Sequence, residues 1–190
     1  RERLELGERL APQVLERLGE DVHNAVFSFV PNTAETAAEG LARAATKLVR
    51  QQHADQLWND VSSGTAKREQ LDALVEPTIR VERLAHKDQR MRTFIASDAT
   101  RRDLVLHVYD VTRDLVPPGS TLVMLDDSIV RGTTLKKSIL HILDRLGPKR
   151  IVVASSAPQI RYPDCYGIDM ARMGDFIAFQ AAVSLLKERG

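Results

Sequence analysis

The stretch TLVMLDDSIVRGTT at residues 121–134 limits what this chain can fold into more than any other part of the sequence. Its first five residues are mostly apolar, which is typical of a parallel strand that is buried on both faces. Asp126 and Asp127 follow, and a turn with one Gly and one Arg leads to two Thr that can open a helix. Because open α/β sheets bind ligands at the carboxyl ends of their strands, the stretch predicts an α/β fold with a site at the two acids.

The residue types in this stretch suit different portions of a phosphorylated sugar. Neighbouring carboxylates accept hydrogen bonds from vicinal hydroxyls, or share a hard cation with them. The turn after them offers backbone N–H groups, hydroxyls and a helix N-terminus, which together bind phosphate readily. Taken singly, an Asp, Ser or Thr at such a junction is explained equally well as an N-cap. Two acids followed directly by a phosphate-type turn favour the binding site.

The composition of the chain excludes several classes of protein. Its 190 residues, 43% hydrophobic and 28% charged, predict one globular domain. A net charge of +1 with both signs interspersed gives no electrostatic reason to expect a nucleic acid partner. Cys165 is the only cysteine, so a disulfide framework is excluded and a cytoplasmic location is expected. No apolar run is long enough for a membrane span, so no membrane partner is expected.

Apolar spacing predicts a helix, a strand and a second helix in the N-terminal part of the chain. The first helix covers residues 1–19, where Pro12 marks a break or kink. The strand covers residues 24–30, and an Ala-rich helix runs from the turn after it to about Arg50.

The middle of the chain carries weaker signals. Residues 51–76 are polar and predict a loop followed by a short helix over 67–74, with Trp58 as a local packing anchor. A half-buried strand is expected over 78–84, and a helix over 98–106.

Beyond the central stretch, the pattern predicts a strand–helix–strand unit. Residues 135–146 have helical spacing, and residues 151–154 read as a buried strand, so a right-handed parallel crossover encloses the acids. A C-terminal helix over about 175–188 is expected to pack along one face through Phe176, Phe179, Val183 and Leu186.

Two blocks of the sequence resemble one known family. Residues 123–134, VMLDDSIVRGTT, resemble the phosphoribosyl pyrophosphate (PRPP) motif of type I phosphoribosyltransferases. The residues DDSIVRGTT within it resemble the form of this motif in glutamine PRPP amidotransferase (amidophosphoribosyltransferase). Residues 154–170, ASSAPQIRYPDCYGIDM, resemble the same family at the expected order and spacing. The resemblance covers most of the chain apart from roughly residues 51–76, which read as a polar insertion.

This resemblance implies a fold and a domain organisation. The expected fold is a parallel-sheet type I phosphoribosyltransferase fold with helices on both faces, formed by residues 1–190 as one domain. The glutaminase domain that the family carries N-terminal to it is absent from these residues. Because the chain starts at Arg1 in a helical pattern, we expect a fragment of a longer protein.

The resemblance also implies roles for the residues of the central stretch. Asp126 and Asp127 would be catalytic, binding the ribose hydroxyls and a metal ion. The 5′-phosphate would be bound by Ser128, Ile129, Val130, Arg131, Gly132, Thr133 and Thr134.

Two other segments supply the remaining candidate residues. The Pro-x-Thr pattern at residues 31–33 resembles the pyrophosphate loop of the family, so Thr33 is a candidate ligand for pyrophosphate and metal, although capping explains it too. Residues 86–95, HKDQRMRTFI, resemble the flexible loop that closes over PRPP. Lys87 and Arg90 are candidate substrate-binding residues there and Arg92 is a candidate catalytic residue, the alternative being a solvated charge run.

The implied activity is that of a pentosyltransferase. It would form 5-phosphoribosylamine and pyrophosphate from PRPP and ammonia, the first step of de novo purine biosynthesis, using free ammonia rather than glutamine in this fragment. Mg²⁺ is the implied cofactor, and no iron–sulfur cluster is expected because one Cys cannot supply several thiolates. Purine nucleotides as feedback inhibitors and a homo-oligomeric assembly are further implications.

Two alternatives stay open at the level of sequence. A nucleobase-salvage phosphoribosyltransferase would share the PRPP motif but would recognise a purine or pyrimidine base. A non-catalytic PRPP or nucleotide-binding regulator would share the fold without turnover. The second is kept open by residues 84–91, which depart from the pattern of the family's closing loop.

Overall fold

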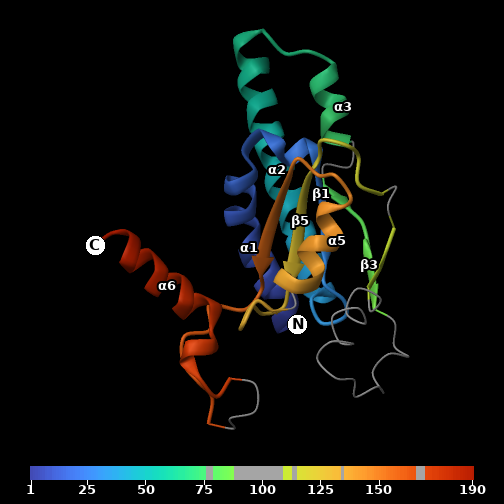
Figure 1. The fold of residues 1–190 in the computed structure, drawn as a ribbon. Coiled ribbons are helices and arrows are strands. Elements are labelled where there is room, and N and C mark those ends of the chain that lie inside the picture. The colour runs from blue at the N-terminus through green and yellow to red at the C-terminus, as the bar shows by residue number, and fades with distance from the viewer. Residues whose placement is uncertain (76–78, 88–108, 113–114, 134, 166–169) are drawn as a thin grey trace.

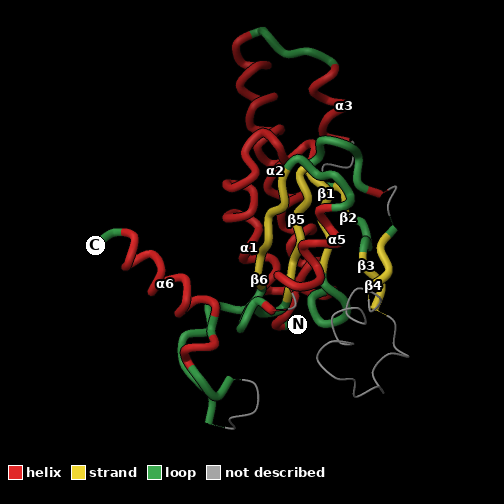
Figure 2. Tube along the Cα trace, viewed as in Figure 1, coloured by secondary structure: helices red, strands yellow, loops and turns green. Residues whose placement is uncertain are grey.

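A parallel four-stranded sheet forms the centre of the protein, seen here in a computed structural model that describes residues 1–75, 79–87, 109–112, 115–133, 135–165 and 170–190. The strand order is β2-β1-β5-β6, from β2 (Arg80–Val81), β1 (Ala25–Phe29), β5 (Thr121–Asp126) and β6 (Arg150–Ser155). All three pairings are parallel, and a separate antiparallel pair joins β3 (Ala85–Lys87) to β4 (Tyr109–Val111) (Figure 2).

Helices cover both faces of this sheet (Figure 1). On one face lie α1 (Glu2–Leu18) and α2 (Glu35–Ser63), with the 3₁₀ turn η1 (Gly19–Asn24) leading into β1. On the other lie the π-helical η4 (Leu135–Ile139) and α5 (Leu140–Asp144), which connect β5 to β6. The predicted α/β fold with helices on both faces and a strand–helix–strand unit around the acids is therefore confirmed.

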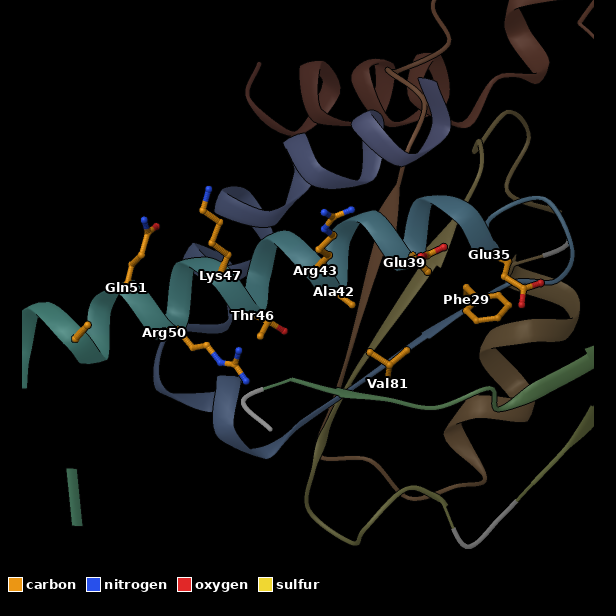
Figure 3. A pocket seen from close by; sticks show the side chains of 12 residues that line it. Phe29, Glu35, Glu39, Ala42, Arg43, Thr46, Lys47, Arg50, Gln51 and Val81 are labelled. Carbon is orange, nitrogen blue, oxygen red and sulfur yellow. The ribbon is translucent and has the colours of Figure 1, made fainter. Parts of the chain in front are cut away.

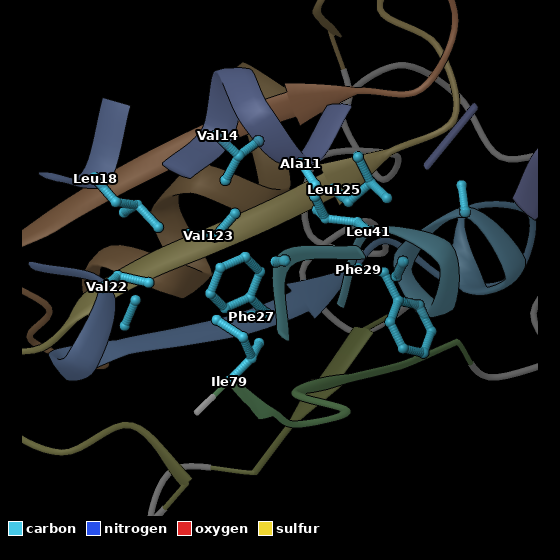
Figure 4. Packing of buried hydrophobic residues seen from close by; sticks show 14 of the residues in the cluster. Ala11, Val14, Leu18, Val22, Phe27, Phe29, Leu41, Ile79, Val123 and Leu125 are labelled. Atoms are coloured by element: carbon cyan, nitrogen blue, oxygen red, sulfur yellow. The ribbon is translucent and has the colours of Figure 1, made fainter. Parts of the chain in front are cut away.

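Alternation along the central strands divides the core into two clusters. Phe27, Phe29, Val123 and Leu125 pack toward α1 and α2 (Figure 4). Val26, Leu122 and Met124 pack toward η4 and α5 on the other face. This follows from the two-residue period of a strand, whose successive side chains point to opposite faces. Because both faces are covered, residues 122–125 have no exposed surface, as the apolar run predicts.

The two long helices cross closely at a pair of glycines. A Cβ at Gly7 would collide with the carbonyl oxygen of Ala37, and one at Gly40 with the carbonyl oxygen of Leu4. Only glycine permits this approach of two backbones. Of the break or kink predicted at Pro12, the break is wrong, because α1 continues through this residue to Leu18.

The polar segment after Arg50 is helical, which corrects the predicted loop. α2 extends through it and ends at Gly64, whose φ of 74° is the left-handed conformation common at helix C-termini. α3 (Glu69–Val75) then forms the second arm of a hairpin, and it confirms the short helix expected there. Trp58 is 72% exposed, so its assignment as a packing anchor is wrong. A solvent-exposed helix needs no apolar stripe, and apolar periodicity therefore could not detect it.

The C-terminal helix differs from its prediction in packing rather than in position. α6 (Ile177–Glu188) follows the 3₁₀ turn η5 (Met173–Asp175) and extends away from the sheet (Figure 1). Phe176 is fully buried, but Phe179 is 40% and Leu186 71% exposed, and no residue of α6 itself is buried. The expected packed face is therefore wrong beyond the first turn.

Some predictions fall partly or wholly outside the described residues. The strand expected over 78–84 is observed only at Arg80–Val81, and the helix expected over 98–106 is outside the described part of the chain. Among the described helices, none combines the length and the apolar character that a membrane crossing requires.

Candidate functional site

The carboxyl ends of three neighbouring strands meet at Asp126. Parallel pairing places Leu125 opposite Phe29 of β1 and Ala154 of β6. Beyond the strands, the Val30 N–H donates to the Leu125 carbonyl at 2.8 Å, and the Ser156 N–H donates to the Asp126 carbonyl at 3.0 Å. The acids therefore lie where an open parallel sheet binds its ligands, as the sequence predicted.

The two acids are linked to each other and to β6. The Asp127 N–H donates to Asp126 Oδ1 at 2.8 Å, and Ser128 Oγ donates to Asp127 Oδ1 at 3.3 Å. The Ala157 N–H and Ser156 Oγ both donate to the Asp127 carbonyl, at 2.9 and 3.2 Å. These bonds fix the backbone on which both carboxylates are carried.

Burial changes the protonation of Asp126. Loss of solvent, the nearby Asp127 carboxylate and a side-chain hydrogen bond raise the pKa of Asp126 from 3.8 to about 6, although the Asp127 N–H opposes the rise. At neutral pH the group is still mostly ionised, and a ligand that donates hydrogen bonds or carries positive charge would favour this form. A desolvated carboxylate in a cleft with a charged neighbour is a frequent feature of functional sites.

The segment that begins at the second acid, residues 127–132, is called the second turn below. Its Gly132 has φ of 65°, a conformation that strains other residues, and the Gly132 carbonyl accepts the Lys136 N–H at 2.9 Å as the helix begins. Ser128, Ile129 and Val130 are half-buried, whereas Arg131 is exposed. Thr133 is exposed at the start of the helix, and Thr134 lies outside the described residues. Backbone groups and hydroxyls are thus gathered at the helix start, as phosphate binding requires.

The first turn, residues 30–34, leaves the same edge of the sheet one strand away. Thr33 is exposed, Ala34 is 1% exposed, and the peptide bond between Pro31 and Asn32 is cis. Directly after the turn, Glu35 forms an ion pair with Arg83, whose guanidinium lies 5.3 Å from the ring centroid of Phe29. The structure therefore brings Thr33 to the edge that carries Asp126 and Asp127.

Of the cationic candidates Lys87, Arg90 and Arg92, only Lys87 lies within the described residues. Lys87 is the last residue of β3 and pairs with Tyr109 of β4. Arg90 and Arg92 lie outside the described residues. Their predicted roles stay predictions.

Three residues that contribute to the edge were not singled out from the sequence. Ser156 and Ala157 belong to the second family-like block, which signalled similarity without assigning a role to these residues. Ile177 contacts the second turn from the C-terminal segment, through the donation of its N–H to the Val130 carbonyl at 2.9 Å. No local pattern links residue 177 to residue 130, so this contact follows only from the fold.

The described residues contain no group of three or more His, Cys, Asp or Glu side chains that could hold a metal ion by themselves. The rings of His23 and His53 stack with centroids 5.4 Å apart, and Cys165 is exposed with a free thiol. The donor set at the sheet edge is thus two adjacent carboxylates and hydroxyls. That set fits a cation such as Mg²⁺, which in proteins is bound by one or two carboxylates together with substrate oxygens and water.

A hollow of about 1000 Å³ lies elsewhere, between α2 and the edge strand β2 (Figure 3). Phe29 and Val81 form its apolar floor, and Arg50 and Thr46 point toward it from the helix. Its lining includes Phe29 and Glu35, near the end of β1, but neither Asp126 nor Asp127, and it is mostly an open groove along the helix. The convergent polar groups are not in this groove but at the ends of β1 and β5, so the candidate site is placed there.

The known proteins to which this chain is similar include amidophosphoribosyltransferases and a regulatory enzyme of purine biosynthesis. The chain is 32% identical over 178 residues to the amidophosphoribosyltransferase of Pseudomonas aeruginosa. The matched region covers 93% of this chain and 28% of that relative. A solved structure of an allosteric regulatory enzyme of purine biosynthesis matches with a TM-score of 0.61 at 30% identity, over 93% of this chain and 30% of that one. No protein-family model matches.

A second solved structure, glutamine PRPP amidotransferase from B. subtilis with ADP and GMP, matches with a TM-score of 0.60 at 28% identity. It covers 98% of this chain and 33% of that chain. The chain thus spans about a third or less of the length of the proteins it resembles. The acidic pair at the end of β5, the parallel sheet and the likeness over most of the chain identify this polypeptide as related to the amidophosphoribosyltransferases, with the fold of their phosphoribosyltransferase part.

Proposed function

We propose that this domain binds PRPP at the carboxyl edge of its sheet and transfers the phosphoribosyl group to ammonia. The products would be 5-phosphoribosylamine and pyrophosphate, as in the first step of purine biosynthesis. The observation that carries the proposal is the half-buried pair Asp126 and Asp127, followed directly by the Gly132 turn at a helix start. The likeness to amidophosphoribosyltransferases favours this activity over nucleobase salvage.

The proposed binding mode assigns each end of the substrate to one turn. The 5′-phosphate would be bound by Ser128 to Thr134, in the second turn and at the helix start that follows it, where N–H groups and hydroxyls are concentrated. The ribose hydroxyls would donate to Asp126 and Asp127, and the pyrophosphate would face Thr33 in the first turn. Lys87, Arg90 and Arg92 are proposed to approach the substrate from the segment that follows β3.

The reaction then requires positioning more than a reactive side chain. The nitrogen lone pair of ammonia attacks C1 of the ribose, the C1–O bond breaks, and pyrophosphate leaves with the bonding electrons. One proton passes from the new ammonium group to water. Holding both ends of PRPP fixes the line of attack, and carboxylates near the ring stabilise the positive charge that develops there.

Mg²⁺ is the cofactor we propose for this site. Asp126, Asp127 and Thr33 would hold it together with substrate oxygens, in keeping with the small number of protein donors at the edge. When bound, the ion would supply positive charge that stabilises the leaving pyrophosphate. An iron–sulfur cluster is not part of the proposal, because the chain has one cysteine.

Further features of the proposal rest on the likeness alone. Purine nucleotides are proposed as feedback inhibitors, because one similar structure is that of an allosteric enzyme and another was solved with ADP and GMP. A homo-oligomeric assembly and a cytoplasmic location are proposed on the same basis.

The direct experiment is the release of pyrophosphate from PRPP by the 190-residue chain. Ammonium, glutamine, or a purine or pyrimidine base is supplied as the acceptor, with and without Mg²⁺. We expect turnover with ammonium and Mg²⁺ only, and a rate about 10²-fold lower in Asp127→Asn, because an amide cannot replace the charge near the ring.

Each other outcome selects a different function. Turnover only with a base would establish a salvage enzyme. PRPP binding by calorimetry without turnover would establish a regulator. Equal rates for wild type and Asp127→Asn would contradict the assignment of the acids.

A further inference from the structure

We propose that Ile177, at the start of the C-terminal helix, is a positioning residue that holds the second turn in its phosphate-binding shape. The inference rests on the proposed function, since it concerns the 5′-phosphate end of the same site. It assigns a role in substrate affinity to a side chain distant from the acidic motif in sequence.

Ile177 contacts the second turn at two points. Its backbone N–H donates to the Val130 carbonyl at 2.9 Å. Its side chain occupies the space beside Gly132, where an added Cβ would lie 2.5 Å from Ile177 Cδ1 and 3.6 Å from Cγ1. The turn is therefore restrained by a hydrogen bond at one residue and by apolar contact two residues later.

The start of α6 is itself well anchored. Phe176 is fully buried, and its N–H donates to the Met173 carbonyl at 3.0 Å. Gln180 closes the first turn of the helix, because its N–H donates to the Phe176 carbonyl at 3.0 Å and its Nε2 to the Gly174 carbonyl at 2.9 Å. The burial of Phe176 thus attaches the start of α6 to the protein, and the hydrogen bonds within residues 173–180 fix the backbone of Ile177 relative to it.

This contact is not a by-product of helix packing. No residue of α6 is buried, and Leu185 and Leu186 farther along it are 49% and 71% exposed. Since α6 is exposed to solvent along its length and held only at its N-terminal end, its N-terminal residues restrain the segment that they contact. Here they touch the loop whose N–H groups must point at a phosphate, and small displacements of such groups weaken binding strongly.

The two ends of the substrate provide a specific test. Affinities for ribose 5-phosphate and for pyrophosphate with Mg²⁺ are measured by calorimetry on the 190-residue chain. In Ile177→Ala we expect ribose 5-phosphate to bind about tenfold more weakly and pyrophosphate to bind as in wild type, because only the second turn is loosened. Leu186→Ala, which shortens an aliphatic side chain on the same helix, is the matched control and should change neither affinity.

Two further variants separate positioning from general damage. Ile177→Leu keeps the side-chain volume and should restore ribose 5-phosphate affinity to within about threefold of wild type. Gly132→Ala should weaken binding less in the Ile177→Ala background than alone, because the collision with Cδ1 is then removed. Equal weakening of both ligands in Ile177→Ala, or no weakening of ribose 5-phosphate, would overturn the proposal.

Amide hydrogen exchange, measured without ligand, tests the positioning role of Ile177 independently of the proposed function. If wild type binds neither ligand, the proposed function fails, and amide hydrogen exchange of residues 128–133 then decides the positioning role. Faster exchange in Ile177→Ala than in Leu186→Ala supports it, and equal exchange contradicts it.

Discussion

The two turns at the carboxyl edge of the sheet are held in place by different means. The first turn, after β1, takes one hydrogen bond across the sheet, from the Val30 N–H to the Leu125 carbonyl, and its other contacts are local: Ala34 is buried and its carbonyl accepts the Ala38 N–H at 2.9 Å as α2 begins. The second turn, after β5, receives hydrogen bonds from Ser156, Ala157 and Ile177, all from later segments.

This difference indicates how each turn responds to change. The first is a local strand-to-helix junction whose shape depends on a few consecutive residues and on the exposed pair of Glu35 and Arg83. The second is a junction of three segments, so its geometry depends on β6 and α6 as well as on its own residues. Substitutions in the second turn should therefore have larger effects than substitutions in the first.

The largest effect in the set below is expected for the charge of Asp126. Its pKa is about 6 in the fold and 3.8 as a free side chain, so between these values the folded state binds more protons than the unfolded state. Stability from this group is thus complete below pH 3.8 and is lost as pH rises through 6. Asp126→Asn cannot titrate, and at pH 7 it should be more stable than wild type by roughly 1 to 3 kcal/mol.

The measurement is urea unfolding of wild type and Asp126→Asn from pH 4 to 8. The difference in free energy of unfolding should grow with pH up to about 7 and then level off. Asp55→Asn, on an exposed position of α2, controls for the loss of one negative charge. A difference that does not vary with pH would show that burial of the Asp126 carboxylate, beside the second turn, does not destabilise the fold.

An intermediate effect is expected for Thr33 in the first turn. Thr33→Ala removes a hydroxyl proposed to bind pyrophosphate, and should weaken pyrophosphate binding with Mg²⁺ about tenfold, as for loss of one hydrogen bond to a charged group. Ribose 5-phosphate affinity should stay at the wild-type value, the reverse of the pattern expected for Ile177→Ala. Calorimetry with both ligands checks this. The control is Thr36→Ala, because Thr36 is likewise exposed but lies at the beginning of helix α2, outside the first turn. Loss of both affinities would mean that the two turns do not act separately.

The smallest effect is expected for the ion pair beside the first turn. The side chains of Glu35 and Arg83 are 52% and 43% exposed, so water screens their attraction. Glu35→Gln should change the free energy of unfolding by less than about 1 kcal/mol. Thermal unfolding in low and high salt measures it, and a larger, salt-sensitive loss would show that the first turn is less local than its contacts indicate.

Much of the site could be predicted because its signals are local. An apolar run ending in Asp126 and Asp127 predicts a buried strand with acids at its end, and β5 confirms both. The turn with Gly132 needs a positive φ, which glycine supplies. These features depend on neighbouring residues, so they can be read along the chain.

The wrong predictions that rested on apolar patterns share one physical cause. Trp58 and the apolar residues of α6 have patterns that suggest burial, yet burial requires a partner surface that only the fold provides. Conversely, residues 51–63 lack an apolar stripe and are helical nonetheless, because a helix in solvent needs none. The spacing of apolar residues indicates which side chains could be buried, but it does not show whether another part of the protein packs against them.

The sequence by itself determined the α/β class, the central strand and the position of the acids at its end, because strand burial and turn chemistry are short-range properties. Only the tertiary structure decided that β1 and β5 are adjacent strands, that burial shifts the protonation of Asp126, and that Ile177 contacts Gly132. These depend on contacts between distant segments, whose pairing no local pattern encodes. The acids of residues 121–134 were evident from the chain, but the support around them was not.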